Sequence, residues 1–173
     1  MEKVILTDSF DKQIGTLEKI EAHRKALLHR AISVFICNTK GEWLLQQRAL
    51  SKYHSGGLWT NTCCTHPAPD ETNIDAANRR LKFEMGMRSE LSEIFSFIYK
   101  EPLDNELTEH EYDHVFLGIT NRAPNINTDE AMAWKYISYD SLMEDMEKHP
   151  ENYTVWFKKI VHRVAAEIKK LSI

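Results

Sequence analysis

Apolar residues in the first part of the chain fall into short runs that are separated by turn residues. Val4–Leu6 and Ala31–Cys37 are two such runs, and the second is rich in β-branched and aromatic residues, which favour strands. Asn38 and Gly41 then indicate a turn, so Trp43–Gln47 is predicted to form the second strand of a hairpin with a loop of about four residues.

The pattern changes to helical spacing in the middle of the chain. A helix is predicted over Asp70–Gly86, where Asp70 or Thr72 can cap the start and Gly86 stands at the position of a left-handed C-terminal residue. One face of this helix is apolar, and it consists of Ile74, Ala77, Leu81 and Met85.

The remaining chain alternates again between the two patterns. Phe95–Tyr99 and Tyr112–Ile119 are predicted strands joined by the polar link KEPLDNELTEHE, and Trp134–Ile137 is a predicted short strand. Leu142–Lys148 has a weak helical pattern. An amphipathic C-terminal helix is marked by Phe157, Ile160, Val161, Val164, Ile168 and Leu171. Strands on both sides of a central helix predict an α/β or α+β layered domain that covers residues 1–173.

Composition narrows the class of protein without giving a function. The 42% hydrophobic and 28% charged residues are ordinary for a globular protein, and 173 residues suffice for one domain with a core. No apolar run approaches the ~18 residues of a membrane span. A net charge of -4 argues against a general nucleic-acid binder. The N-terminus has neither signal-peptide nor transit-peptide character, and three cysteines, an odd number, indicate reduced thiols, so we expect a cytoplasmic protein.

The segment WTNTCCTHP, residues 59–67, holds two adjacent cysteines and a histidine. In an extended segment Cys63 and Cys64 point to opposite faces, so one can pack in the core while the other is functional. A lone cysteine is most often a small buried hydrophobe, and the residues alone leave the role of Cys64 open.

Other polar residues are candidate metal ligands, but each could equally be an ordinary structural or surface residue. His23 and His29 are six residues apart, which is not a helical same-face spacing, and each could be structural or exposed. Glu109 and Glu111 share a face if they lie in a strand, but they could also end a solvated acidic loop. Together with His66, these groups would make a mixed nitrogen and oxygen site for Zn²⁺, Mn²⁺ or Mg²⁺. The remaining histidines receive no catalytic role, namely His54, His110, His114, His149 and His162.

Residues 65–87 resemble the Nudix signature G-x5-E-x7-R-E-U-x-E-E-x-G-U, where U is apolar. The positions that match are Glu71, Arg79, Leu81, Glu84, Gly86 and Met87. Thr65 stands in place of glycine, and Arg80 and Phe83 stand in place of two glutamates. Nudix hydrolases use these carboxylates to hold divalent cations at a phosphoanhydride. The altered helix could still bind a diphosphate, but it is poorly equipped to hydrolyse one.

Four further segments resemble one Nudix subfamily, the type I isopentenyl diphosphate isomerases. They are GTLEKIEAH, RALSKYHSGGLWTNTCCTHP, RRLKFEMG and EHEYDHVF, in the order and spacing of that family. The resemblance covers roughly residues 4–159. It implies a Nudix-type fold with mixed sheets flanked by helices.

The resemblance also implies roles for individual residues. Cys64 and Glu111 match the catalytic cysteine and glutamate, Tyr99 matches a tyrosine near that glutamate, and Trp156 matches a tryptophan that faces the hydrocarbon. The ligands of a first divalent metal, which could be Mn²⁺, Mg²⁺ or Zn²⁺, match His23, His29, His66, Glu109 and Glu111. Glu84 matches a ligand of Mg²⁺ that the substrate diphosphate helps to hold. The basic residues around the diphosphate match Lys19, Arg48, Lys52 and Arg80.

The implied activity is the interconversion of isopentenyl and dimethylallyl diphosphate in isoprenoid biosynthesis. The expected partner is therefore a small isoprenoid diphosphate, without nucleic acid or membrane, and the expected state is a monomer or weak homodimer. Two alternatives stay open, a Nudix hydrolase of another diphosphate and a non-catalytic module that binds a metal or diphosphate. Thr65 and Asp70 replace glycines that are usual in the family, which raises the question of whether the loop at Cys64 keeps its geometry.

Overall fold

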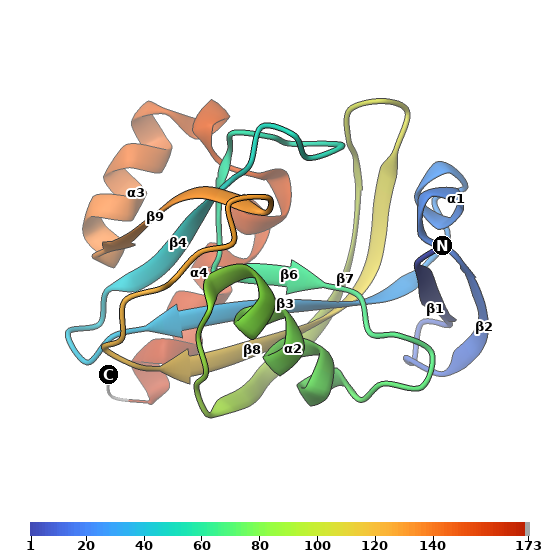
Figure 1. Ribbon diagram of the computed structural model, residues 1–173, viewed down its shortest axis with the longest axis horizontal. Coiled ribbons are helices and arrows are strands. Elements are labelled where there is room, and N and C mark those ends of the chain that lie inside the picture. The colour runs from blue at the N-terminus through green and yellow to red at the C-terminus, as the bar shows by residue number, and fades with distance from the viewer. Residues whose placement is uncertain (172–173) are drawn as a thin grey trace.

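The computed structural model describes residues 1–171, which form one mixed sheet of nine strands with helices on both faces (Figure 1). In chain order the elements are β1 Lys3–Thr7, β2 Gln13–Glu18, α1 Lys19–Arg24, β3 His29–Cys37, β4 Trp43–Arg48, β5 Trp59–Thr60, β6 Cys63–Thr65, α2 Asn73–Met85, β7 Leu91–Pro102, β8 Thr108–Ile119, β9 Ala131–Ile137, α3 Tyr139–Lys148, the 3-10 turn η1 Pro150–Asn152 and α4 Val155–Lys170. This arrangement confirms the α+β layered fold that the sequence predicts.

Strand β3 is the organising strand of the site. It pairs in parallel with β8 over its whole length, which places His29 opposite Glu111. It pairs antiparallel with β6, where Ser33 lies opposite Cys64. Because Ser33 also pairs with Val115 of β8, strands β6 and β8 lie on the two edges of the same stretch of β3.

The sheet has an apolar core on each face, because the residues of β3 alternate in direction. Phe35 and Cys37 belong to the core that α4 covers. Val34 and Ile36 belong to the other core, with Leu81 and Met85 of α2. Figure 1 shows α2 in front of the sheet and α4 behind it.

The central helix is shorter than predicted and begins with Thr72 as its cap. The Thr72 side chain accepts a hydrogen bond from the Asp75 backbone N–H, and Gly86 ends the helix with a φ of 62°. A Cβ at Gly86 would lie 2.4 Å from the carbonyl oxygen of Asn125, so this position requires glycine. The prediction that Ile74 lies on the buried face is wrong, because its exposed fraction is 36%.

The polar link between the predicted fourth and fifth strands, Phe95–Tyr99 and Tyr112–Ile119, is largely strand. β7 and β8 form a long hairpin that pairs Pro102 with Thr108, so only residues 103–107 form the turn. The charged composition hid these strand ends, but their alternation buries Glu109, Glu111 and Asp113 on one face. Five further elements are not predicted from the sequence because they are short or polar, namely β2, α1, β5, β6 and η1. Among residues 1–171, no helix has the length and apolarity needed to cross a membrane.

Candidate active site

One pocket brings together most of the residues that the sequence singles out. Its walls come from α1, β3, β6, α2, β7, β8 and α4 and from the loop after β4. The predicted residues that line it are Lys19, Arg48, Lys52, Cys64, His66, Arg80, Glu84, Tyr99, Glu109, Glu111 and Trp156. His23 and His29 do not line the pocket, but they lie against His66 with ring centroids 5.6 and 5.0 Å away.

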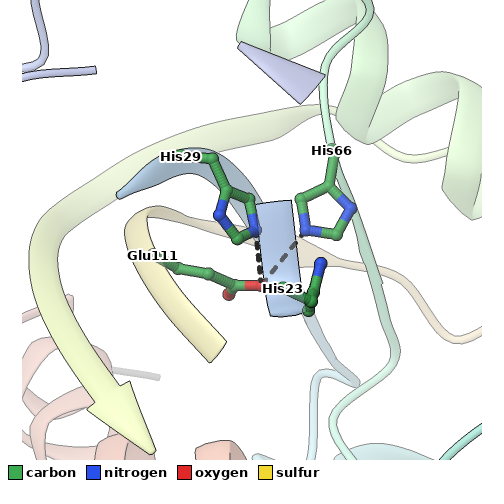
Figure 2. Close-up of side chains that lie close together, drawn as sticks. All are labelled: His23, His29, His66 and Glu111. Carbon is green, nitrogen blue, oxygen red and sulfur yellow. Dashed lines mark hydrogen bonds and ion pairs between the residues drawn. The ribbon is translucent and has the colours of Figure 1, made fainter. Parts of the chain in front are cut away.

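Three histidines and one glutamate form a compact group at the edge of this pocket (Figure 2). One ligand atom from each of His23, His29, His66 and Glu111 lies within 4.8 Å of the others. Glu111 Oε1 lies 3.1 Å from Nε2 of His66 and 3.7 Å from Nε2 of His29. Glu109, the fifth predicted ligand, is not a member of this group.

The hydrogen bonds of two histidines fix which nitrogen faces the glutamate. Nδ1 of His23 lies 2.7 Å from the Lys19 carbonyl oxygen, and Nδ1 of His29 lies 2.8 Å from that of Leu27. A carbonyl only accepts, so each Nδ1 carries a proton, and each Nε2 offers a lone pair when the ring is neutral. Both Nε2 atoms are buried and have no hydrogen-bond partner among the described residues.

The group therefore gathers three imidazoles around one carboxylate. Burial lowers the pKa of His66 to about 4 and also lowers the pKa of His23. Burial alone would raise the pKa of Glu111, but its contacts with His29 and His66 hold that pKa well below the usual range. Neutral imidazoles around an ionised carboxylate are the donor set that a divalent metal ion takes, and the group fits one.

Tyr99 joins the two glutamates of β8. Its hydroxyl oxygen lies 2.5 Å from Glu109 Oε2 and 2.8 Å from Glu111 Oε2. A single hydroxyl proton cannot serve two ionised carboxylates. Burial, followed by the charge of Glu111, raises the pKa of Glu109 well above its usual range. The shared hydroxyl and the raised pKa both favour a proton on Glu109 over one on Glu111.

The two neighbouring cysteines separate as the extended conformation predicts. Cys63 is fully buried in the core under α2, whereas Cys64 is half-buried and lines the pocket. Burial raises the pKa of both thiols. The three cysteines are all free. Thr65 and Asp70 are not among the described residues that have positive φ, so the backbone conformation at neither position requires glycine.

Cationic side chains at the pocket are paired with acidic ones. Arg80 Nε donates to Glu84 Oε1 at 2.5 Å, and its Nη2 donates to Glu130 Oε2 at 2.7 Å. Lys52 Nζ donates to the same Glu130 oxygen at 2.5 Å. Lys19 Nζ lies 3.1 Å from Glu2 Oε2. These cations are thus already grouped around anionic carboxylate oxygens, and anionic phosphate oxygens could bind the same side chains.

The apolar end of the pocket is built on Trp156, which is 4% exposed. The Arg48 guanidinium lies 5.2 Å from the centroid of its ring, and the His54 ring meets it edge-on at 5.7 Å. Burial lowers the pKa of His54 to about 3, so this imidazole is neutral. The indole and the neutral imidazole form an aromatic wall that suits a hydrocarbon group, and the charged Arg48 guanidinium lies beside it.

Four pocket or near-pocket residues escaped the sequence analysis, namely Ser33, His54, Asp113 and Glu130. Asp113 could have been found, because it continues the period of two from Glu109 and Glu111. Glu130 had no local signal, since it lies in the polar segment between β8 and β9 and reaches Arg80 only through the fold.

Comparisons with known proteins agree with this site. The family model of the NUDIX domain matches residues 27–157. The Isopentenyl-diphosphate Delta-isomerase of Pectobacterium atrosepticum is 49% identical over 95% of this chain and 92% of its own length. The Isopentenyl-diphosphate Delta-isomerase 2 of Aromatoleum aromaticum is 47% identical over 94% of this chain and 86% of its own length.

Solved structures support the fold at lower identity. The crystal structure of DR0079 from Deinococcus radiodurans matches with a TM-score of 0.79 and 17% identity, over 94% of this chain and 98% of that one. A MutT protein from Methanosarcina mazei Go1 matches with a TM-score of 0.67 and 19% identity, over 82% and 96%. The family model, the relatives and the pocket agree, and the chain belongs to the isopentenyl-diphosphate Delta-isomerase family of the Nudix superfamily.

Proposed function

We propose that the protein is a type I isopentenyl-diphosphate Delta-isomerase that interconverts isopentenyl and dimethylallyl diphosphate in isoprenoid biosynthesis. The observation that carries the proposal is one pocket that holds a thiol, an ionised glutamate and an indole beside a cluster of cations. Relatives with that name share 44–49% of their residues with this chain over nearly its whole length.

The reaction moves a double bond by adding a proton at C4 and removing one from C2. Protonation of an isolated alkene gives a tertiary carbocation, which needs a positioned acid and a site without water. In this proposal Cys64 and Glu111 each handle one proton, with Tyr99 hydrogen-bonded to Glu111. The positions of Cys64 and Glu111 support these roles. Strands β6 and β8 pair with the same stretch of β3, so they hold the two groups on separate sides of that strand.

The cation must be stabilised without being captured. An indole face does this through its quadrupole, which contributes ~2 kcal/mol or more when it is desolvated. Trp156 lines the pocket and is the indole assigned to this role, with the Arg48 guanidinium 5.2 Å from its ring centroid. The neighbouring His54 is neutral and does not repel a positive charge.

The diphosphate is assigned to the cationic end of the pocket. Lys19, Arg48, Lys52 and Arg80 would bind its oxygens, with Mg²⁺ at Glu84. Phe83 is 52% exposed and cannot ligate a metal, so this helix lacks the carboxylate set of a hydrolase.

The first metal is assigned to His23, His29, His66 and Glu111, with Glu109 adjacent through Tyr99. When bound there, a divalent ion would fix the orientation and acidity of the Glu111 carboxylate. Its identity among Mn²⁺, Mg²⁺ and Zn²⁺ is decided by elemental analysis of the protein as purified.

The test is incubation of the protein with isopentenyl diphosphate and divalent metal, followed by detection of the allylic isomer. Cys64→Ser and Glu111→Gln should nearly abolish turnover with the fold intact, whereas the exposed control Glu90→Gln should not. A folded, metal-loaded protein that forms no isomer contradicts the proposal. Release of phosphate would favour a hydrolase, and diphosphate binding without turnover would favour a sensor module.

We further propose a cytoplasmic enzyme that acts as a monomer or weak homodimer, without nucleic acid or membrane. Three free cysteines suit a reducing compartment. Sedimentation at micromolar concentration should give the mass of one chain, and a tight oligomer would contradict this.

A further inference from the structure

Asp113 is a buried carboxyl that the proposed mechanism does not use. It is 1% exposed and lies on β8, two residues beyond Glu111. Its Oδ2 accepts a hydrogen bond of 2.7 Å from Ser33 Oγ, while its Oδ1 has no hydrogen-bond partner among the described residues. Burying a carboxyl with an unpaired oxygen is costly, and such a group is kept where its remaining contact serves a purpose.

That remaining contact controls the hydroxyl proton of Ser33. Ser33 is 3% exposed and pairs with Cys64 across the β3–β6 ladder. Its Oγ lies 3.7 Å from Cys64 Sγ, within reach of a sulfur hydrogen bond. A hydroxyl has one proton and two lone pairs. In this arrangement the Ser33 hydroxyl donates to Asp113 Oδ2, which leaves a lone pair of Ser33 for the thiol.

The second neighbour of the thiol, Asn61, is constrained in the same way. Its Nδ2 donates to the carbonyl oxygens of Val34 at 3.1 Å and Cys63 at 2.9 Å, which uses both amide protons. Nδ2 also donates to Cys64 Sγ at 3.2 Å, so one of its protons is shared between a carbonyl oxygen and the sulfur. Asn61 Oδ1 accepts from Thr60 Oγ1 at 2.9 Å and lies 3.4 Å from Cys64 Sγ as a second acceptor.

We infer that Asp113, acting through Ser33, is a positioning residue that fixes the direction of the Cys64 S–H bond. The thiol proton lies between two acceptors, Ser33 Oγ and Asn61 Oδ1, and the S–H group therefore has a defined orientation at the pocket wall. The catalytic consequence of this inference rests on the proposed function, in which the Cys64 thiol transfers one of the two protons. Ser33 and Asp113 would then hold that thiol in position.

The S–H stretching band of Cys64 tests this geometry without turnover. The band is assigned by its loss in Cys64→Ala, since Cys37 and Cys63 keep theirs. Ser33→Ala removes one acceptor, and the band should move to higher wavenumber. Asp113→Asn preserves the volume and should also shift the band, because an amide can donate to Ser33 Oγ and release its proton toward sulfur. Ser92→Ala, the same substitution at an exposed strand position, should leave the band in place.

Turnover adds a second readout that loss of folded protein would not reproduce. In Ser33→Ala and Asp113→Asn, kcat should fall about 10- to 100-fold at nearly unchanged KM, because misplacement by about 1 Å can cost on the order of 100-fold. Ser33→Thr retains the hydroxyl and should recover most of the rate. In D₂O, the ratio of deuterium entering at C2 and at C4 should change in Ser33→Ala.

The outcomes separate the two ideas. An S–H band that stays in place in both Ser33→Ala and Asp113→Asn overturns the positioning role. The band can also move in these two variants although the wild-type protein has no isomerase activity. That result would support the positioning role and refute the proposed function. An unchanged deuterium ratio and an unchanged kcat in Ser33→Ala would show that this orientation does not matter for the reaction.

Discussion

Glu130 should oppose the binding of diphosphate, and Glu130→Gln should therefore strengthen it. One oxygen, Oε2, accepts from Lys52 at 2.5 Å and from Arg80 at 2.7 Å, the two cations assigned to the substrate. Burial would raise the pKa of Glu130, but the hydrogen bond from Lys52 and the charge of Arg80 lower it, so the group is ionised at neutral pH. A phosphate oxygen must displace this carboxylate or share its partners.

The magnitude follows from the exposure of the three side chains, which is 16% for Glu130, 17% for Lys52 and 20% for Arg80. Hydrogen bonds to charged groups contribute about 1.5–3 kcal/mol when buried, whereas exposed ion pairs contribute only about 0–1 kcal/mol. Glutamine keeps an acceptor and loses the charge, so we expect about 1–2 kcal/mol, or about 5- to 30-fold tighter binding.

Calorimetric titration with inorganic diphosphate at fixed Mg²⁺ measures this difference, and Glu147→Gln on the exposed face of α3 is the matched control. The gain should shrink as salt is raised, because these groups are partly exposed. Weaker binding by Glu130→Gln would refute the reasoning and would show that the carboxylate helps to hold the anion, for example through Mg²⁺.

Three further predictions concern the metal, the core and pH. Removal of the metal with a chelator should lower Tm, measured by calorimetry, because the buried Nε2 atoms of His23 and His29 would lose their partner. An unchanged Tm in a protein shown to lose metal would count against the site. Leu81→Ala should cost about 2–5 kcal/mol of unfolding free energy in urea, because Leu81 is fully buried on the face of α2 that packs on the sheet. A cost near zero would contradict this packing. The pKa of His54 is lowered from 6.5 to about 3 by burial, so the unfolded chain binds the extra proton below pH 6.5 and stability is lost as pH falls toward 3. His54→Gln should reduce the slope of unfolding free energy between pH 6 and 4 by up to about 1.4 kcal/mol per pH unit, and an equal slope would be inconsistent with a neutral His54.

The sequence by itself determined the local elements that have a strong periodic or turn signal. The helix at α2 was predicted because its apolar spacing, its cap and its terminal Gly86 are all encoded within a few residues. The strand β3 was found because β-branched and aromatic residues stand in one run. The opposite orientation of Cys63 and Cys64 also follows from the two-residue period of an extended chain.

Family resemblance added the candidate residues, but only the tertiary structure decided their partners. His29 meets Glu111 because β3 and β8, about 80 residues apart, pair in parallel, and no local pattern encodes that register. The same pairing buries Asp113 beside Ser33, and the approach of the segment before β9 to α2 brings Glu130 onto Arg80. Periodicity describes which face a residue takes, whereas the contact across that face depends on which distant strand lies beside it. The sequence therefore identified the residues that can act chemically, and the fold decided which charged and polar groups lie next to each of them.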